Sequence, residues 1–196
     1  MVEPSITNHI SFEQDRAPLM VADIKIEPWV DSNEIETTSL IKRNMESFDE
    51  SEAVLIATFR RLNNLKKIYS KNGCCLYVAR NIDENGNGKA IACAGLGPLH
   101  GLPLSEGIGE IRDLVVDKEF RGQGIGSRLL HRCIEEAKNM NYQRLYLETS
   151  QNMNNARKLF LRSGFRAVTE STAIGSMNKD LPCYFLMENL NEPSKP

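Results

Sequence analysis

The chain has 196 residues, of which 41% are hydrophobic and 26% charged, and its formal net charge is -2. This size and balance fit a single globular domain with a substantial core. The slight negative charge argues against a nucleic-acid partner, which usually needs a basic face, and no apolar stretch is long enough to cross a bilayer.

The cysteines and the N-terminal residues indicate a cytoplasmic protein. None of the five cysteines forms a pair with the two-residue gap of a zinc or redox motif, so we expect reduced thiols and no bound metal. Cys93 and Cys133 lie in apolar patterns and are expected in the core. The first residues lack the charged-then-apolar order of a secretory signal.

The first half of the chain predicts a polar arm over 1–18, before one domain over 19–190 and a short tail over 191–196. Alternating and helical apolar spacings give the expected elements: strands at 23–27, 75–80 and 90–96, and helices at 34–45 and 53–69. Residues 83–88 read Asp-Glu-Asn-Gly-Asn-Gly, which predicts a hairpin turn because Asn and Gly accept positive φ.

The second half begins with a Gly/Pro-rich loop over 98–109 and then alternates strands with helices. The expected elements are strands at 110–116, 144–149 and 184–188 and helices at 125–140 and 154–162. Asn141 suits the left-handed residue that closes the first of these helices, and Asn154 or Asn155 suits the N-cap of the second. This order predicts a layered α/β domain.

The turn Arg121-Gly122-Gln123-Gly124-Ile125-Gly126 carries the clearest chemical signal. It joins a strand to the start of a helix, where backbone N–H groups lack internal partners and the helix dipole favours anions. Glycines let a phosphate approach the backbone, and Arg121 adds a positive charge. The turn therefore has the chemistry of a pyrophosphate cradle.

A glycine-rich turn alone is equally consistent with a plain tight turn packed on a sheet. Two other phosphate-binding motifs do not fit. A Walker loop needs Gly-Lys-Ser/Thr, and a dinucleotide fingerprint needs a glycine where Ser127 stands.

The turn matches the Arg/Gln-x-x-Gly-x-Gly/Ala signature and so resembles the GNAT acyltransferase superfamily. The segment Ala156–Phe165 is similar to that family's final helix and closing Gly-Phe. The resemblance runs from about Cys75 to Glu188 and implies a GNAT fold: a mixed, mostly antiparallel, twisted sheet of about six or seven strands with about four flanking helices. It also implies acetyl-CoA as co-substrate.

The resemblance implies cofactor contacts in three segments. The pantetheine arm would pair with the backbone that follows a bulge in the fourth strand, at Leu114, Val115 and Val116. The pyrophosphate would meet the turn and the helix start: Arg121, Gly122, Gln123, Gly124, Ile125, Gly126 and Ser127. Asn154 and Asn155 lie near where the family's last helix borders the cofactor, although capping is their more ordinary role.

Glu110 matches a strand-four glutamate that is the general base in some family members. A solvated carboxylate or a partner of Arg112 is an equally good interpretation, and Glu148 is a second candidate that we expect to be structural. Phe160 stands where many members carry a Tyr general acid. We expect its ring at a helix edge that faces the cofactor sulfur, with Cys183 or Tyr184 as alternative acids.

The expected reaction moves the acetyl group of acetyl-CoA to a primary amine, carried by a small, amino-acid-like molecule or by a peptide. The alternative is an acetyl-CoA-binding sensor or interaction module without efficient catalysis. The acidic residues of the first helical region suggest a cationic acceptor, although a solvated face explains them too: Glu34, Glu36, Asp49, Glu50 and Glu52. Whether the protein forms a homodimer stays open.

Overall fold

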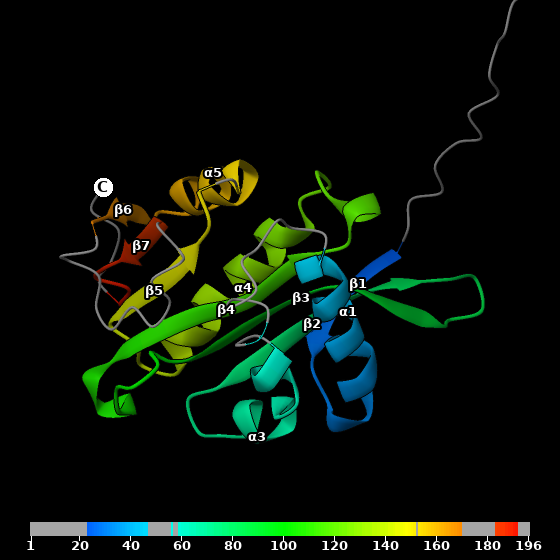
Figure 1. Ribbon diagram of the computed structural model, residues 1–196, viewed down its shortest axis with the longest axis horizontal. Coiled ribbons are helices and arrows are strands. Elements are labelled where there is room, and N and C mark those ends of the chain that lie inside the picture. The colour runs from blue at the N-terminus through cyan, green and yellow to red at the C-terminus, as the bar shows by residue number, and fades with distance from the viewer. Residues whose placement is uncertain (1–22, 47–55, 57–58, 152, 170–182, 192–196) are drawn as a thin grey trace, which may run out of the picture.

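The computed structural model describes residues 23–46, 56, 59–151, 153–169 and 183–191. These residues form a seven-stranded sheet in the order β1-β2-β3-β4-β5-β7-β6 (Figure 1). The strands are β1 (Asp23–Pro28), β2 (Cys75–Ile82), β3 (Gly88–Pro98), β4 (Ile108–Val116), β5 (Arg144–Thr149), β6 (Arg166–Val168) and β7 (Cys183–Met187). All neighbours are antiparallel except β4 and β5, which are parallel, so the predicted mixed α/β sheet is confirmed.

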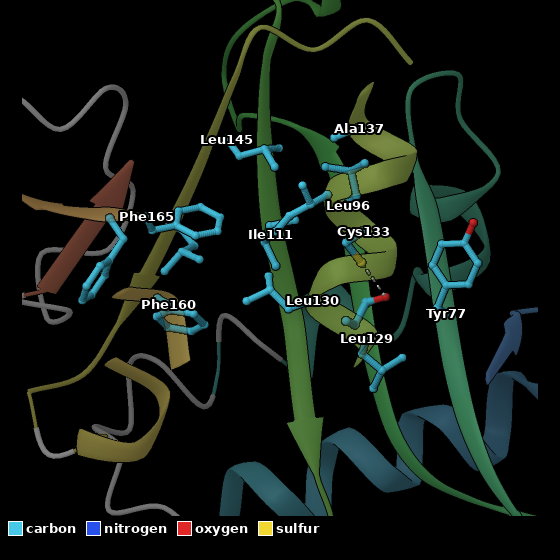
Figure 2. Close-up of a cluster of buried hydrophobic side chains, with 14 of the residues drawn as sticks. Tyr77, Leu96, Ile111, Leu129, Leu130, Cys133, Ala137, Leu145, Phe160 and Phe165 are labelled. Carbon is cyan, nitrogen blue, oxygen red and sulfur yellow. Dashed lines mark hydrogen bonds between the residues drawn. The ribbon is translucent and has the colours of Figure 1, made fainter. Parts of the chain in front are cut away.

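Helices cover both faces of the sheet. Among the described residues they include α1 (Glu34–Glu46), α3 (Leu65–Tyr69), α4 (Ile125–Asn139) and α5 (Asn154–Arg162). One face packs under α1 and α3, where Leu40 and Leu65 meet Val78 and Val115. The other packs under α4 and α5 in the larger core cluster of Figure 2.

The side of α4 that packs on the sheet follows from its apolar residues at three- and four-residue spacing. They form its buried stripe: Ile125, Leu129, Leu130, Cys133, Ile134 and Ala137. Cys133 Sγ also donates a hydrogen bond of 3.7 Å to the carbonyl of Ala94 (Figure 2). Cys93 is fully buried on the opposite face, so both cysteines are core residues as expected.

Several local predictions are confirmed. In the turn between β2 and β3, Asp83 Oδ1 accepts hydrogen bonds from the N–H groups of Asn85 and Asn87, and Gly86 has φ of 78°. Asn141 closes α4 in the left-handed conformation with φ of 61°. In the described chain, no helix is both long enough and apolar enough to cross a membrane.

Other local predictions are wrong. The helix expected over 53–69 breaks in a turn at 63–64 before α3, whose Lys66 N–H is bound by Glu34 Oε1 at 3.0 Å. The strand β6 was not predicted. Neither Asn154 nor Asn155 caps α5: the N-cap is Met153, with no side-chain cap bond within the described residues. The expected arm over 1–18 lies outside the described residues, as does all of the expected tail except Asn191.

The feature that positions the site is the separation of β4 from β5. The two strands pair only from Ile108 to Glu110, opposite Arg144 to Tyr146. Beyond this point the strands diverge (Figure 1), and the edge of β4 that faces β5 has no strand partner among the described residues. The last residues of β4 therefore present a backbone edge without a described strand partner, just before the chain enters the turn that leads to α4.

Candidate active site

The turn before α4 depends on two glycines in the left-handed region. Gly122 and Gly124 have φ of 79° and 78°, and Gly124 is the N-cap of α4. A side chain at either position would have open space but a strained backbone. The glycines thus fix the path of the chain, and they leave the helix N-terminus uncovered by side chains.

The N–H groups of this turn are available to a ligand. Within the described residues, no hydrogen bond from the N–H groups of residues 122–127 is present, and Arg128 N is the first to bond, to Gly124 O at 3.0 Å. The turn is largely exposed. A row of free donors at a helix N-terminus is an anion site of the kind that holds phosphate.

Arg121 directly precedes these N–H groups, and its side chain forms hydrogen bonds that hold the turn in place. Its Nε donates to Val116 O at 2.8 Å and its Nη2 to Asn44 Oδ1 at 2.9 Å. Asn44 in turn donates to Asp117, which also pairs with Arg43 of α1. The guanidinium therefore ties the turn to α1 and β4, and it adds positive charge beside the turn without leaving these partners.

A bulge interrupts β4 where the sequence resemblance placed one. Gly95 pairs with Arg112 and Cys93 with Val115, so Asp113 and Leu114 together face Ala94. Asp113 has φ of 54°, a conformation that Asp tolerates better than most residues. Leu114 of the bulge and Val116 beyond it pack toward α4, while Val115 packs toward α1. Their backbone lies on the edge of β4 that no described strand pairs, where Val116 O accepts the hydrogen bond from Arg121 Nε.

The bulge places Asp113 in a buried network that sequence reasoning missed. Its Oδ2 accepts a hydrogen bond of 2.5 Å from the Tyr69 hydroxyl and pairs with Arg61. Burial alone would raise the pKa of Asp113, but the charge and hydrogen bonds of Arg61, with that of Tyr69, hold it below its usual value. For Tyr69, burial and the neighbouring carboxylate raise the pKa well above normal.

Glu110 lies at the point where β4 and β5 part. It is the last residue of β4 that pairs with β5, opposite Tyr146, and it is partly exposed. Its carboxylate lies 3.9 Å from Arg112 Nη2, and Oε2 is buried without a hydrogen bond from any described residue. Glu148 accepts a hydrogen bond of 2.7 Å from the Tyr146 hydroxyl.

Comparison with known proteins identifies the family to which this chain belongs. The model of the Acetyltransferase (GNAT) family matches residues 37–165, more than half of the chain. The chain belongs to this family.

Relatives and solved structures agree with this assignment. The chain is 29% identical over 117 residues to human N-acetyltransferase 8B, covering 59% of this chain and 49% of that protein. It is 35% identical over 80 residues to the Aminoalkylphosphonate N-acetyltransferase of Salmonella typhimurium, covering 41% and 52%. It thus spans about half the length of the curated relatives it matches.

Solved GNAT structures share the fold. An acetyltransferase of the GNAT family from Staphylococcus aureus Mu50 superposes with a TM-score of 0.67 at 21% identity, covering 84% of this chain and 98% of the other. An acetyltransferase of Salmonella typhimurium, solved with its cofactor acetyl-CoA, gives 0.67 at 17% identity, covering 89% and 98%.

Phe160, which stands where many GNAT members carry a tyrosine, does not lie where the sequence resemblance predicts. Phe160 is 5% exposed and packs edge-on against Phe165 and Phe185, with ring centroids 6.3 and 5.5 Å apart. Figure 2 shows Phe160 and Phe165 within the main core cluster. The expectation of a ring at an open helix edge is wrong, because the apolar stripe of α5 turns this residue inward.

The other residues that the sequence resemblance assigns to the site differ in how far they are exposed. Asn154 and Asn155 are exposed at the start of α5. That helix borders the turn, since a β-carbon on Gly126 would lie 3.6 Å from Leu159 Cδ2. Of the alternative acids, Tyr184 is buried and stacked on Tyr146 with centroids 6.4 Å apart, and Cys183 is partly buried.

Proposed function

We propose that this chain is an N-acetyltransferase that moves the acetyl group of acetyl-CoA directly to the primary amine of a small molecule. The observation that carries the proposal is one continuous stretch, 111–127: a strand edge that no described strand pairs is followed by N–H groups at a helix N-terminus that bond to no described residue. An extended polar arm fits the edge and a pyrophosphate fits the donors. The GNAT relative solved with acetyl-CoA supports this choice of ligand.

Two segments of the chain would bind two different parts of the cofactor. Residues 122–127 would bind the pyrophosphate, and the backbone of Leu114, Val115 and Val116 would orient the pantetheine arm. Acetyl-CoA supplies the acetyl group as a thioester. Asn154 and Asn155, which are exposed at the start of α5, would contact the cofactor from that helix.

Glu110 would accept the proton of the amine, directly or through one water, because it is the last residue of β4 that pairs with β5, at the point where the two strands part. In the reaction, the amine nitrogen bonds to the acetyl carbon and the carbon–sulfur bond breaks. The sulfur keeps the electron pair, and the amine proton passes to Glu110 or to water. A thiolate with a pKa near that of free Cys, about 8.5, can leave without an acid, so Phe160 does not forbid the reaction.

The acidic residues of the first helical region do not argue for a cationic acceptor. Glu36 accepts a hydrogen bond of 2.7 Å from Ala90 N and pairs with Arg80, while Glu34 binds Lys66 N. Asp49, Glu50 and Glu52 lie outside the described residues. The relative named for aminoalkylphosphonates supports a small amine as acceptor.

One observation favours a second candidate, an acetyl-CoA sensor without efficient catalysis: the core position of Phe160 leaves no hydroxyl at the usual acid position. Release of free CoA, measured with and without a panel of primary amines, separates the two. Amine-dependent release with a matching acetylated product supports the enzyme. Tight acetyl-CoA binding without acetylation of any amine or peptide supports the sensor.

A further inference from the structure

Arg112 lies on the same face of β4 as Glu110, and its side chain fits against a glycine of the neighbouring strand β3. Its guanidinium lies across Gly97 of β3, where a β-carbon would collide with Nη2. Nη2 donates to Pro98 O at 3.0 Å. The Nε group is buried, and no described residue accepts its proton. The absence of a side chain at Gly97 thus lets a charged group lie flat on the sheet with part of its bonding capacity unused.

Neither neighbouring carboxylate accepts a hydrogen bond from Arg112 within the described residues. Asp113 Oδ2 is bonded by Arg61 and Tyr69, its Oδ1 has no partner among the described residues, and the charge of Arg112 helps to keep the pKa of Asp113 low. Glu110 Oε2 is 3.9 Å from Arg112 Nη2, which is too long for a hydrogen bond. Both side chains stay partly accessible, at 14% for Arg112 and 21% for Glu110.

The result is a cation and an anion side by side, each with a buried polar atom that no described residue satisfies. Buried polar groups in native proteins normally have partners, because leaving one unmade is costly. A ligand with a positive group for Glu110 and a negative group for Arg112 satisfies both.

We propose that the acceptor is a small zwitterion, with a primary amine and an acidic group, carboxylate or phosphonate, on the same molecule. Arg112 binds the acidic group and thereby orients the amine toward Glu110. The planar fork of a guanidinium is suited to paired oxygens of this kind. This inference rests on the proposed function and names the substrate class of that site.

The test compares acceptors matched in shape but not in charge. We would measure kcat/KM for β-alanine against β-alaninamide and for 2-aminoethylphosphonate against ethanolamine, with 1,4-diaminobutane as the cationic member. The acidic members are expected to be better by about tenfold to hundredfold, the range for a charge-assisted hydrogen bond. Equal or better use of β-alaninamide, ethanolamine or the diamine would overturn the proposal.

Variants then assign the preference to Arg112. Arg112→Gln should reduce the acid-to-amide ratio to about threefold or less by raising KM for the acid, and Arg112→Lys should keep an intermediate ratio. Arg166→Gln is the matched control, because Arg166 of β6 forms an exposed pair with Glu188. A full ratio retained in Arg112→Gln overturns the proposal, and if that variant does not fold, the wild-type ratios and Arg112→Lys decide.

Failure of the proposed function gives a different result. If acetyl-CoA does not bind, or no amine is acetylated, the enzyme proposal fails while acceptor binding stays measurable by calorimetry on the full chain with CoA present. Binding of β-alanine in preference to its amide would still support the zwitterion site. Absent or equal binding of the two would contradict it.

Discussion

The ring of Tyr69 lies so close over Gly95 that a β-carbon on the glycine would collide with the ring and its hydroxyl. That hydroxyl donates to Asp113 on the β4 bulge. A glycine of β3, a tyrosine of α3 and the bulge of β4 therefore form one packed unit behind the proposed acetyl-transfer site.

Gly95→Ala should displace Tyr69 and lower the free energy of unfolding by about 1–3 kcal/mol, the usual range for overpacking a core. Thermal and denaturant unfolding measure this. Gly126→Ala is the control for stability, since its β-carbon would meet Val116 and Leu159 at ordinary contact distances of 3.5 and 3.6 Å. Equal losses in the two variants would show that Tyr69 yields easily.

Asp113→Asn should remove the charge while keeping a residue that tolerates positive φ. At neutral pH we expect a loss of roughly 3 kcal/mol, the low end for breaking a buried pair, because the Arg61 side chain is 28% exposed.

The pH dependence has a definite sign. The pKa of Asp113 is lower in the folded protein than its usual value, so its stabilisation is complete above about pH 4 and is lost as the pH falls through the folded pKa. Urea unfolding of wild type and Asp113→Asn from pH 7 to 3 should therefore converge at low pH. A constant difference between the two would mean that the charge contributes nothing.

Phe160→Tyr should be destabilising by about 1–3 kcal/mol, since the new hydroxyl would enter a ring cluster that is 5% exposed. Phe120→Tyr serves as the comparison, because Phe120 is only partly buried and its hydroxyl can reach water. Melting temperatures report stability and steady-state rates report catalysis. An unchanged melting temperature with faster turnover would place the ring at the cofactor sulfur after all.

Glu110→Gln should lower kcat by roughly two orders of magnitude, the typical contribution of a general base, while acetyl-CoA affinity changes little. Glu106→Gln, an exposed glutamate in the preceding loop, should retain wild-type rates. The pH profile is the sharper readout, because losing a base removes the rise in rate with pH. Wild-type kcat at every pH would make Glu110 a structural residue only.

Much of this fold could be predicted from local pattern. The stripe of α4, the Asn-Gly hairpin and the left-handed Asn141 are set by residues close together in the chain. The glycine turn could be predicted for the same reason, because the residues that set its backbone path and the charge beside it all lie within 121–126.

The rest depends on contacts between distant residues. Arg61 and Asp113 are 52 positions apart, and only the bulge turns Asp113 onto the same face as Arg112. No alternation in Glu110–Val116 signals that bulge. Phe160 was misplaced because family resemblance gives a position along α5 but not the side that packs against Phe165 and Phe185.

The dissociation constant of acetyl-CoA for wild type and Gly124→Val tests the central claim most directly. Valine at a φ of 78° must move the backbone and with it the row of N–H donors. Parallel titrations with S-acetylpantetheine, which lacks the pyrophosphate, serve as the control ligand. We predict at least a tenfold loss of affinity for acetyl-CoA in folded Gly124→Val, and little change for S-acetylpantetheine. Unchanged acetyl-CoA affinity in the folded variant would contradict a pyrophosphate site at residues 122–127.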